Sequence, residues 1–168
     1  MNSLSKFLDG LEAIPWFEHL GDANRPMAGV RRLRSWDDWP GPEDDGVEAA
    51  ATRAQQLKDE LDQEASRRQV DIRQRWDSIQ TAVRTQASKA VPYDPYQDSW
   101  HGPTQCVWDA AWYAALIACH LQLELPIPID LGRIWSYFEM GHWPCGYVNP
   151  PRNPVDGSAY AAAELLVF

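Results

Sequence analysis

The stretch from Val107 to Leu125, VWDAAWYAALIACHLQLEL, decides the fold of this chain of 168 residues. It is apolar on nearly every helical face, which is typical of a helix buried at the centre of a domain. Asp109, His120 and Gln122 interrupt the apolar run, so the stretch does not resemble a membrane span. We therefore predict a central apolar helix over about 103–124.

A longer helical pattern precedes this helix. Between residues 44 and 91 there is no proline, and apolar residues recur every three or four positions, the spacing of one helix face. Between Ala65 and Ile72 the pattern lacks an apolar residue at the expected position. We expect either one long, curved helix or two antiparallel helices broken near 66–69, packed on the central helix.

The sequence after the central helix predicts a further helix and its end. Asp130 is a suitable N-cap for LGRIWSYFEM (131–140), and Gly141 stands where a glycine would stop that helix. The following GHWPCGY (141–147) predicts a helix stop with an aromatic latch rather than a reactive loop. For SAYAAAELLVF (158–168) we expect a short helix, or a helix with a strand-like end.

The N-terminal part adds little to this pattern. Ser3 to Ala13 predicts a short amphipathic helix capped by Ser3, and GVRRLRSW (29–36) is compatible with a short strand. In sum the sequence predicts a mainly α protein with little or no β structure, forming a single helical domain over 1–168.

Charge and cysteine content restrict the functional class. The net charge of −9 argues against binding nucleic acid, which requires a basic face, and favours a basic partner. The N-terminus lacks the basic-then-apolar pattern of a secretion signal. Three cysteines, an odd number, are most simply free, buried thiols in a reducing compartment. We therefore expect a cytoplasmic protein that does not bind membranes.

The loop SWDDWPGPEDDGVE (35–48) is the candidate partner-binding site. Carboxylates just before a long helix are explained by the positive end of its dipole. That explanation does not cover Asp37 and Asp38, which lie between two tryptophans. Aromatic rings surrounded by carboxylates suit a docking surface for a basic protein. The predicted contact residues are Trp36, Asp37, Asp38, Trp39, Glu43, Asp44, Asp45 and Glu48.

A metal site is the weaker alternative for the histidines and cysteines. On one helix, Cys106 and His120 would lie about 21 Å apart, too far to share an ion. Only His101 and Cys106 could converge with His142 and Cys145. A His-x-x-Cys pair is a weak zinc signal compared with two Cys-x-x-Cys pairs. We therefore predict packed thiols, no metal and no cofactor.

Two other functions remain open. Cys106 falls in the first turn of a helix, where the dipole lowers the pKa of a thiol. TQCVW (104–108) faintly resembles the helix-opening region of papain-like cysteine hydrolases. However, Val107 separates the cysteine from the tryptophan, and Gln105 adjoins Cys106 instead of preceding it by several residues. We predict that the chain is not an enzyme and keep two alternatives: a cysteine hydrolase, and a scaffold that dimerises through the long helix.

Three segments together resemble a bacterial immunity protein of the polymorphic-toxin kind. They are FLDGLEAIPWFEHLG (7–21), WDDWPGPEDD (36–45) and WSYFEMGHWPCGYV (135–148). The resemblance is diffuse and has no signature residue. It implies an acidic, non-catalytic, cytoplasmic inhibitor that sits over the active site of a cognate toxin with a basic surface.

Overall fold

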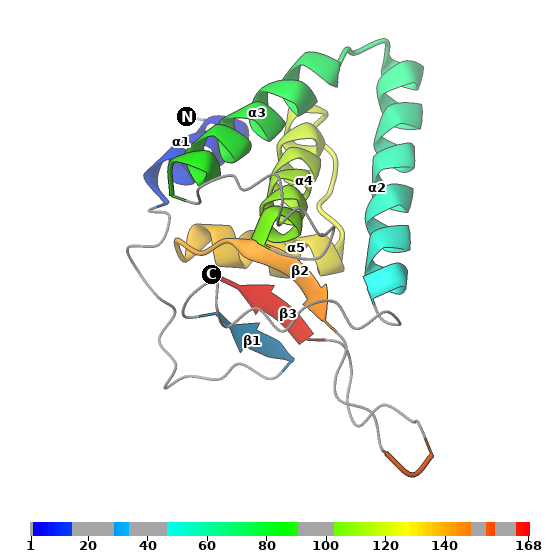
Figure 1. The fold of residues 1–168 in the computed structure, drawn as a ribbon. Coiled ribbons are helices and arrows are strands. Elements are labelled where there is room, and N and C mark those ends of the chain that lie inside the picture. The colour runs from blue at the N-terminus through cyan, green and yellow to red at the C-terminus, as the bar shows by residue number, and fades with distance from the viewer. Residues whose placement is uncertain (1, 15–28, 34–46, 91–102, 149–153, 157–163) are drawn as a thin grey trace.

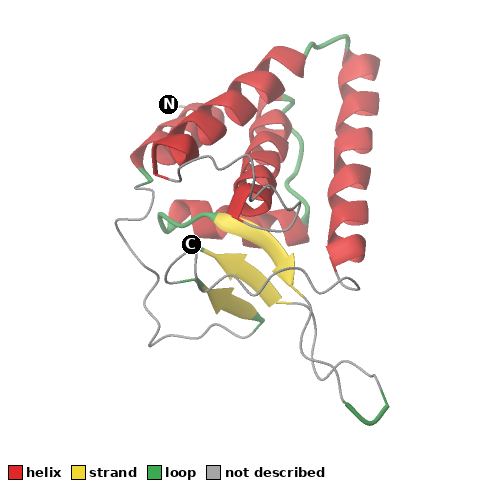
Figure 2. Ribbon diagram, in the orientation of Figure 1, coloured by secondary structure: helices red, strands yellow, loops and turns green. Residues whose placement is uncertain are grey.

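The structure is a computed structural model that describes residues 2–14, 29–33, 47–90, 103–148, 154–156 and 164–168. Within these ranges the side chains of 47–48, 87–90 and 103–106 are not described. The described residues form five helices and a small sheet (Figures 1 and 2), which confirms the prediction of a mainly helical chain. The elements are α1 (Ser3–Ala13), β1 (Val30–Arg32), α2 (Val47–Arg68), α3 (Arg73–Ala90), α4 (Pro103–Gln122), α5 (Ile129–Glu139), β2 (Pro144–Val148) and β3 (Glu164–Val167).

Helix α4 forms the centre of the core. The six residues from Ala114 to Cys119 are completely buried. Helix α3 crosses α4 along much of its length, and α1, α2, α5 and β2 also contact it (Figure 1). The chain places this helix at the centre because its apolar residues leave no polar face to turn toward water.

The segment 44–91 contains two helices that diverge in an open V, not one curved helix or a side-by-side antiparallel pair (Figure 1). Helix α2 ends as Gln69 adopts a left-handed conformation with φ 56°. The N–H of Gln69 bonds to the Ser66 carbonyl at 3.1 Å, and that of Val70 to the Ala65 carbonyl at 2.9 Å. This is a Schellman motif, which satisfies two carbonyls at the end of the helix.

The corner of the V is attached to the C-terminal end of α4. The Arg68 guanidinium donates from Nη1 to the Leu123 carbonyl at 2.6 Å. The Gln122 side chain donates to the Asp71 carbonyl at 3.2 Å and accepts from Arg75 Nε at 3.3 Å. These bonds connect residues about fifty positions apart, so they set the direction in which α3 leaves the corner.

The three-stranded sheet corrects the expectation of little or no β structure. Its order is β1-β3-β2, with β1 parallel and β2 antiparallel to the central β3. The C-terminal segment was expected to be a short helix or a helix with a strand-like end, and its described residues form the strand β3. Leu165 to Val167 are buried, so this apolar run suits a central strand covered by its neighbours. Trp143 and Phe168 exchange two backbone hydrogen bonds of 2.8 Å and extend the β2–β3 pairing.

Helix α5 ends where the sequence predicted, at Gly141. This glycine has φ 79°, its N–H bonds to the Phe138 carbonyl at 3.0 Å, and the N–H of His142 bonds to the Tyr137 carbonyl at 2.9 Å. Trp143 is then buried against Phe138, with ring centroids 5.8 Å apart.

Two predicted N-caps are wrong. Pro128 precedes α5, and Asp130 lies inside its first turn, where a carboxylate still suits the helix dipole. Asn2 caps α1 in place of Ser3, since its Oδ1 accepts a 2.8 Å bond from the Ser5 N–H. Both errors shift a helix start by one or two residues, the usual imprecision at helix ends.

Candidate partner-binding surfaces

The predicted acidic–aromatic loop lies largely outside the described residues. Trp36 to Asp45 fall there, and Glu48 lies in the first turn of α2, where the backbone alone is described. The structure therefore places the end of this loop at the N-terminus of α2. The surface formed by the described residues next to this N-terminus can be compared with the prediction.

That neighbouring surface is formed by α2 and the start of α5. Arg53, in the second turn of α2, donates from Nε to Asp130 Oδ2 at 2.8 Å and lies 3.7 Å from Glu60. The hydrogen bond from Arg53 lowers the pKa of Asp130 and keeps its carboxylate charged. Ile129, next to Asp130, is 88% exposed. An exposed apolar side chain thus lies next to a carboxylate that is bonded to the second turn of α2. Sequence analysis missed it, because only the fold reveals its exposure.

A second surface follows the seam between α3 and α4, which we define by Trp76, Gln80 and Arg84 of α3 and Trp108 and Trp112 of α4. The rings of Trp76 and Trp112 meet edge to face, with centroids 4.9 Å apart. The Arg84 guanidinium lies 4.1 Å from the centroid of the Trp108 ring, which is 49% exposed. Tryptophan and arginine are the residues most often dominant at protein interfaces.

The sequence contains a signal for this seam. Its members recur at intervals of four residues on each helix, so those of one helix lie on the same face. Lys58 of α2 lies 4.7 Å from the Trp76 ring centroid, so three helices meet there. The periodicity places each residue on one face of its own helix. Only the crossing of α3 over α4 brings the two faces together.

A third surface is an apolar groove of about 580 Å³ between α1 and α5. Phe7 anchors it with edge-to-face contacts to Trp135 and Phe138, at centroid distances of 6.0 and 5.8 Å. Gly10 also lines the groove, and an added Cβ there would meet nothing within 4 Å. The groove therefore has room for an apolar side chain of another molecule.

The cysteines differ from the expectation of three free thiols. Cys145 is disulfide-bonded and completely buried in β2. Cys119 is a free thiol whose pKa is raised to about 12, chiefly by burial. The side chain of Cys106 is not among those described, so the cysteine-hydrolase alternative rests on the sequence alone.

The postulated metal set is also changed by this disulfide. A sulfur in a disulfide is not the thiolate that zinc binds, so Cys145 cannot contribute to the set in this state. His101 lies outside the described residues. Among the described residues, no group of three or more His, Cys, Asp or Glu could hold a metal ion.

His120 is buried and belongs to the core of α4. Its Nδ1 lies 2.8 Å from the Leu116 carbonyl, and burial lowers the pKa of its imidazole. The ring is therefore neutral near pH 7, and the charges of Glu60, Arg53 and Asp130 act on it.

A scaffold that dimerises through the long helix would need the apolar residues of 44–91 to be exposed. Those that the structure describes instead pack against the core. Leu57, Leu61, Ile72, Ile79 and Val83 are buried. Of the large apolar residues described in α2, α3 and their junction, Val70 alone is exposed by more than a third, at 38%.

The chain matches no family model, no curated protein and no solved structure. Among the described helices, none combines the length and the apolar character needed to cross a membrane.

Proposed function

We propose that this chain is an immunity protein that binds a cognate bacterial toxin and neutralises it by occluding the active site. The carrying observation is the surface at the N-terminus of α2, where Ile129 is 88% exposed beside the charged Asp130. This surface continues the chemistry of the acidic–aromatic segment 36–48. An exposed apolar side chain next to a carboxylate suits a partner with a basic cleft.

The binding mode follows from the charge and from the rigidity of α2. A net charge of −9 would attract a basic toxin and speed the encounter. Helix α2 is tied to α5 by the Arg53–Asp130 bond and to the end of α4 by the Arg68–Leu123 bond. A toxin that contacts the N-terminal part of α2 thus meets a helix that is already attached to the rest of the fold, which limits the entropy lost on binding.

The decisive experiment needs the toxin. The gene beside this one would encode a protein ending in a toxin domain, and co-expression of the two chains should abolish toxicity and yield a stable complex. Changing Asp37, Asp38, Asp44 and Asp45 to lysine should weaken binding at least tenfold and flatten its salt dependence.

A matched control separates a local contact from a general charge effect. The exposed carboxylates Asp9, Glu12, Asp59 and Asp77 lie on α1, α2 and α3, outside the segment 36–48, and their conversion to lysine changes the net charge by the same amount. This control should slow association without increasing dissociation. Equal effects of both quadruple variants, or no effect of the first, would reject the loop as the interface.

The compartment is open to a separate test. We expect action in the cytoplasm, where a disulfide at Cys145 would be reduced, whereas an oxidising compartment would preserve it. Alkylation of thiols in intact, acid-quenched cells distinguishes the two. Modified Cys145 would support the cytoplasm, and protected Cys145 would place the protein in an oxidising compartment.

A further inference from the structure

Arg84 carries a charge that no described carboxylate balances. It stacks on Trp108 and donates from Nη2 to Gln80 Oε1 at 2.7 Å, but it takes part in none of the ion pairs between described residues. The described charges of α3 are Arg73, Arg75 and Arg84 against Asp77, a net +2 in a chain of −9. Arg84 is therefore an exposed positive charge on a chain whose net charge is −9.

The Gln80 amide beside it has an unused donor. Gln80 is only 7% exposed, and its Nε2 has no hydrogen-bond partner in the structure. Turning the amide over would not help, because a guanidinium can only donate and therefore requires the oxygen of Gln80 to face it. The nitrogen is therefore the atom of the amide that Arg84 does not contact, and a buried donor without an acceptor is costly.

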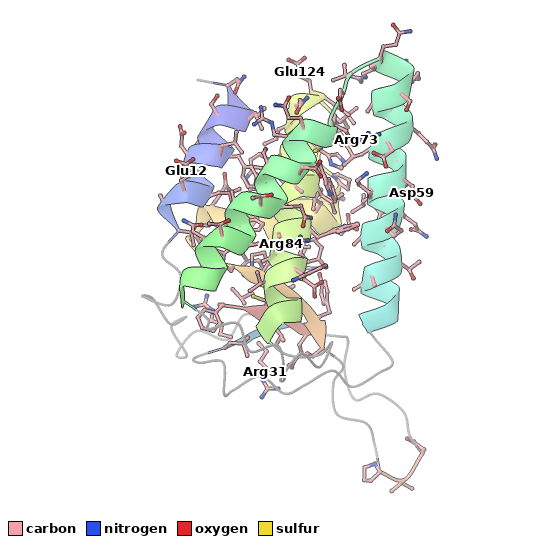
Figure 3. All side chains as sticks on the ribbon, turned by 45° about the horizontal axis from the view of Figure 1, so that its top comes forward. Glu12, Arg31, Asp59, Arg73, Arg84 and Glu124 are labelled. Carbon is pink, nitrogen blue, oxygen red and sulfur yellow. The ribbon has the colours of Figure 1, made fainter. Side chains whose placement is uncertain are left out.

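Trp112 of α4 is a second buried donor without a partner. Its Nε1 is inaccessible to solvent and lacks an acceptor, while its ring meets Trp76 edge to face. The seam thus combines two unused N–H donors, an unbalanced guanidinium and the half-exposed ring of Trp108 (Figure 3 shows Arg84 where α3 crosses α4). Every one of these polar groups offers a proton, so a complementary ligand must supply acceptors.

We propose that the α3–α4 seam binds an acidic segment of a partner protein. A carboxylate of that segment pairs with Arg84, its oxygens supply the acceptor that Gln80 lacks, and Trp108 packs against the adjoining residue. Charge-assisted bonds from a guanidinium to a carboxylate are among the strongest in proteins. The proposal is independent of the immunity function, because it concerns a different surface of opposite charge.

The test uses the full ¹⁵N-labelled chain and two acetylated, amidated peptides, one with six glutamates and the other with six glutamines. The indole N–H resonances of Trp108 and Trp112 are assigned with single Trp→Phe variants. The glutamate peptide should shift both resonances in a saturable manner, and the glutamine peptide should not. Titration to about 5 mM detects a site of millimolar affinity.

Three variants locate the site. Arg84→Gln should weaken binding of the glutamate peptide at least tenfold. Arg73→Gln removes the same charge from the far end of α3 (Figure 3) and should change binding less than about twofold, as expected for an exposed, screened charge. Trp108→Ala keeps the guanidinium and should also weaken binding, so the test does not depend on the folding of one variant.

Specific outcomes overturn the proposal. Unchanged indole resonances up to the highest glutamate concentration would show that water alone fills the seam. Equal losses for Arg84→Gln and Arg73→Gln would show non-specific attraction. Shifts caused by oligothymidylate but not by the glutamate peptide would assign the seam to nucleic acid instead.

Discussion

Asp109 occupies the space that a side chain at Gly146 would need. A Cβ built on Gly146 would lie 2.3 Å from Asp109 Oδ2, well inside van der Waals contact. Gly146 also has φ 98°, a conformation that residues with a side chain rarely adopt. Strand β2 can therefore approach α4 here only with glycine.

Gly146→Ala should lower the free energy of unfolding by about 3 kcal/mol, since it adds backbone strain to a steric clash. Urea denaturation measures the loss. Gly10→Ala, in α1 with open space around it, should instead stabilise the protein by about 0.5–1 kcal/mol. Adding Asp109→Ala to Gly146→Ala should recover only the steric part, so a fully additive double variant would contradict the contact.

Two helices end with a residue other than glycine in the left-handed conformation: Gln69 after α2, with φ 56°, and Glu124 after α4, with φ 52°. Gln69→Gly and Glu124→Gly should each stabilise the protein by about 0.5 kcal/mol, because glycine adopts this conformation without a Cβ penalty. Chemical denaturation tests this, with Gln69→Ala as the control that retains the penalty. A loss of stability in both glycine variants would argue against the two motifs.

Arg68 and its neighbour Arg67 allow a matched comparison at the corner of the V. Arg68 donates to the Leu123 carbonyl across 55 positions, whereas Arg67 bonds to Glu64 on the surface of its own helix. Arg68→Ala should cost roughly 1 kcal/mol, the value of a partly exposed charge-assisted bond. Arg67→Ala should have no measurable effect on the urea midpoint. Equal midpoints for the two variants would mean that the corner does not depend on Arg68.

His120 predicts a loss of stability in mild acid. Burial lowers the pKa of the folded imidazole below its ordinary value of 6.5, so the unfolded chain takes up a proton first as the pH falls. Stability is unaffected by this group above pH 6.5 and decreases below it, toward the folded pKa. The charged groups that influence the ring are Glu60, Arg53 and Asp130. Urea midpoints at pH 7.5, 6.5 and 5.5 should show a smaller decrease for His120→Gln than for the parent chain.

Cys119 should resist alkylation in the folded protein. It is completely buried, its pKa is raised to about 12 by burial, and its sulfur lies 3.9 Å from the Ile72 carbonyl at the start of α3. Iodoacetamide at pH 8 followed by peptide mass analysis should find Cys119 unmodified in buffer and modified in urea. Modification without denaturant would show that α3 separates from α4 in the native state.

Local patterns determined the helices because their hydrogen bonds join residues four apart. The apolar stretch 107–125 and the three-to-four spacing before it were therefore sufficient to predict α4 and the region of the α2–α3 break. Gly141 could be predicted as a helix stop for the same reason: its conformational role depends on its own missing side chain. Net charge and composition, too, are properties of the sequence alone.

Tertiary structure decided what lies far apart in the sequence. Strand β3 pairs with β1, more than 130 positions away. The sequence therefore indicated at most a strand-like end in this segment, and only the fold showed which strands it joins. The α3–α4 seam likewise depends on a crossing that brings Arg84 onto Trp108. The periodicity of each helix places its own residues on one face. The two faces meet only when both helices pack on the same core. This packing is set by the apolar area that the whole chain buries, not by any one segment.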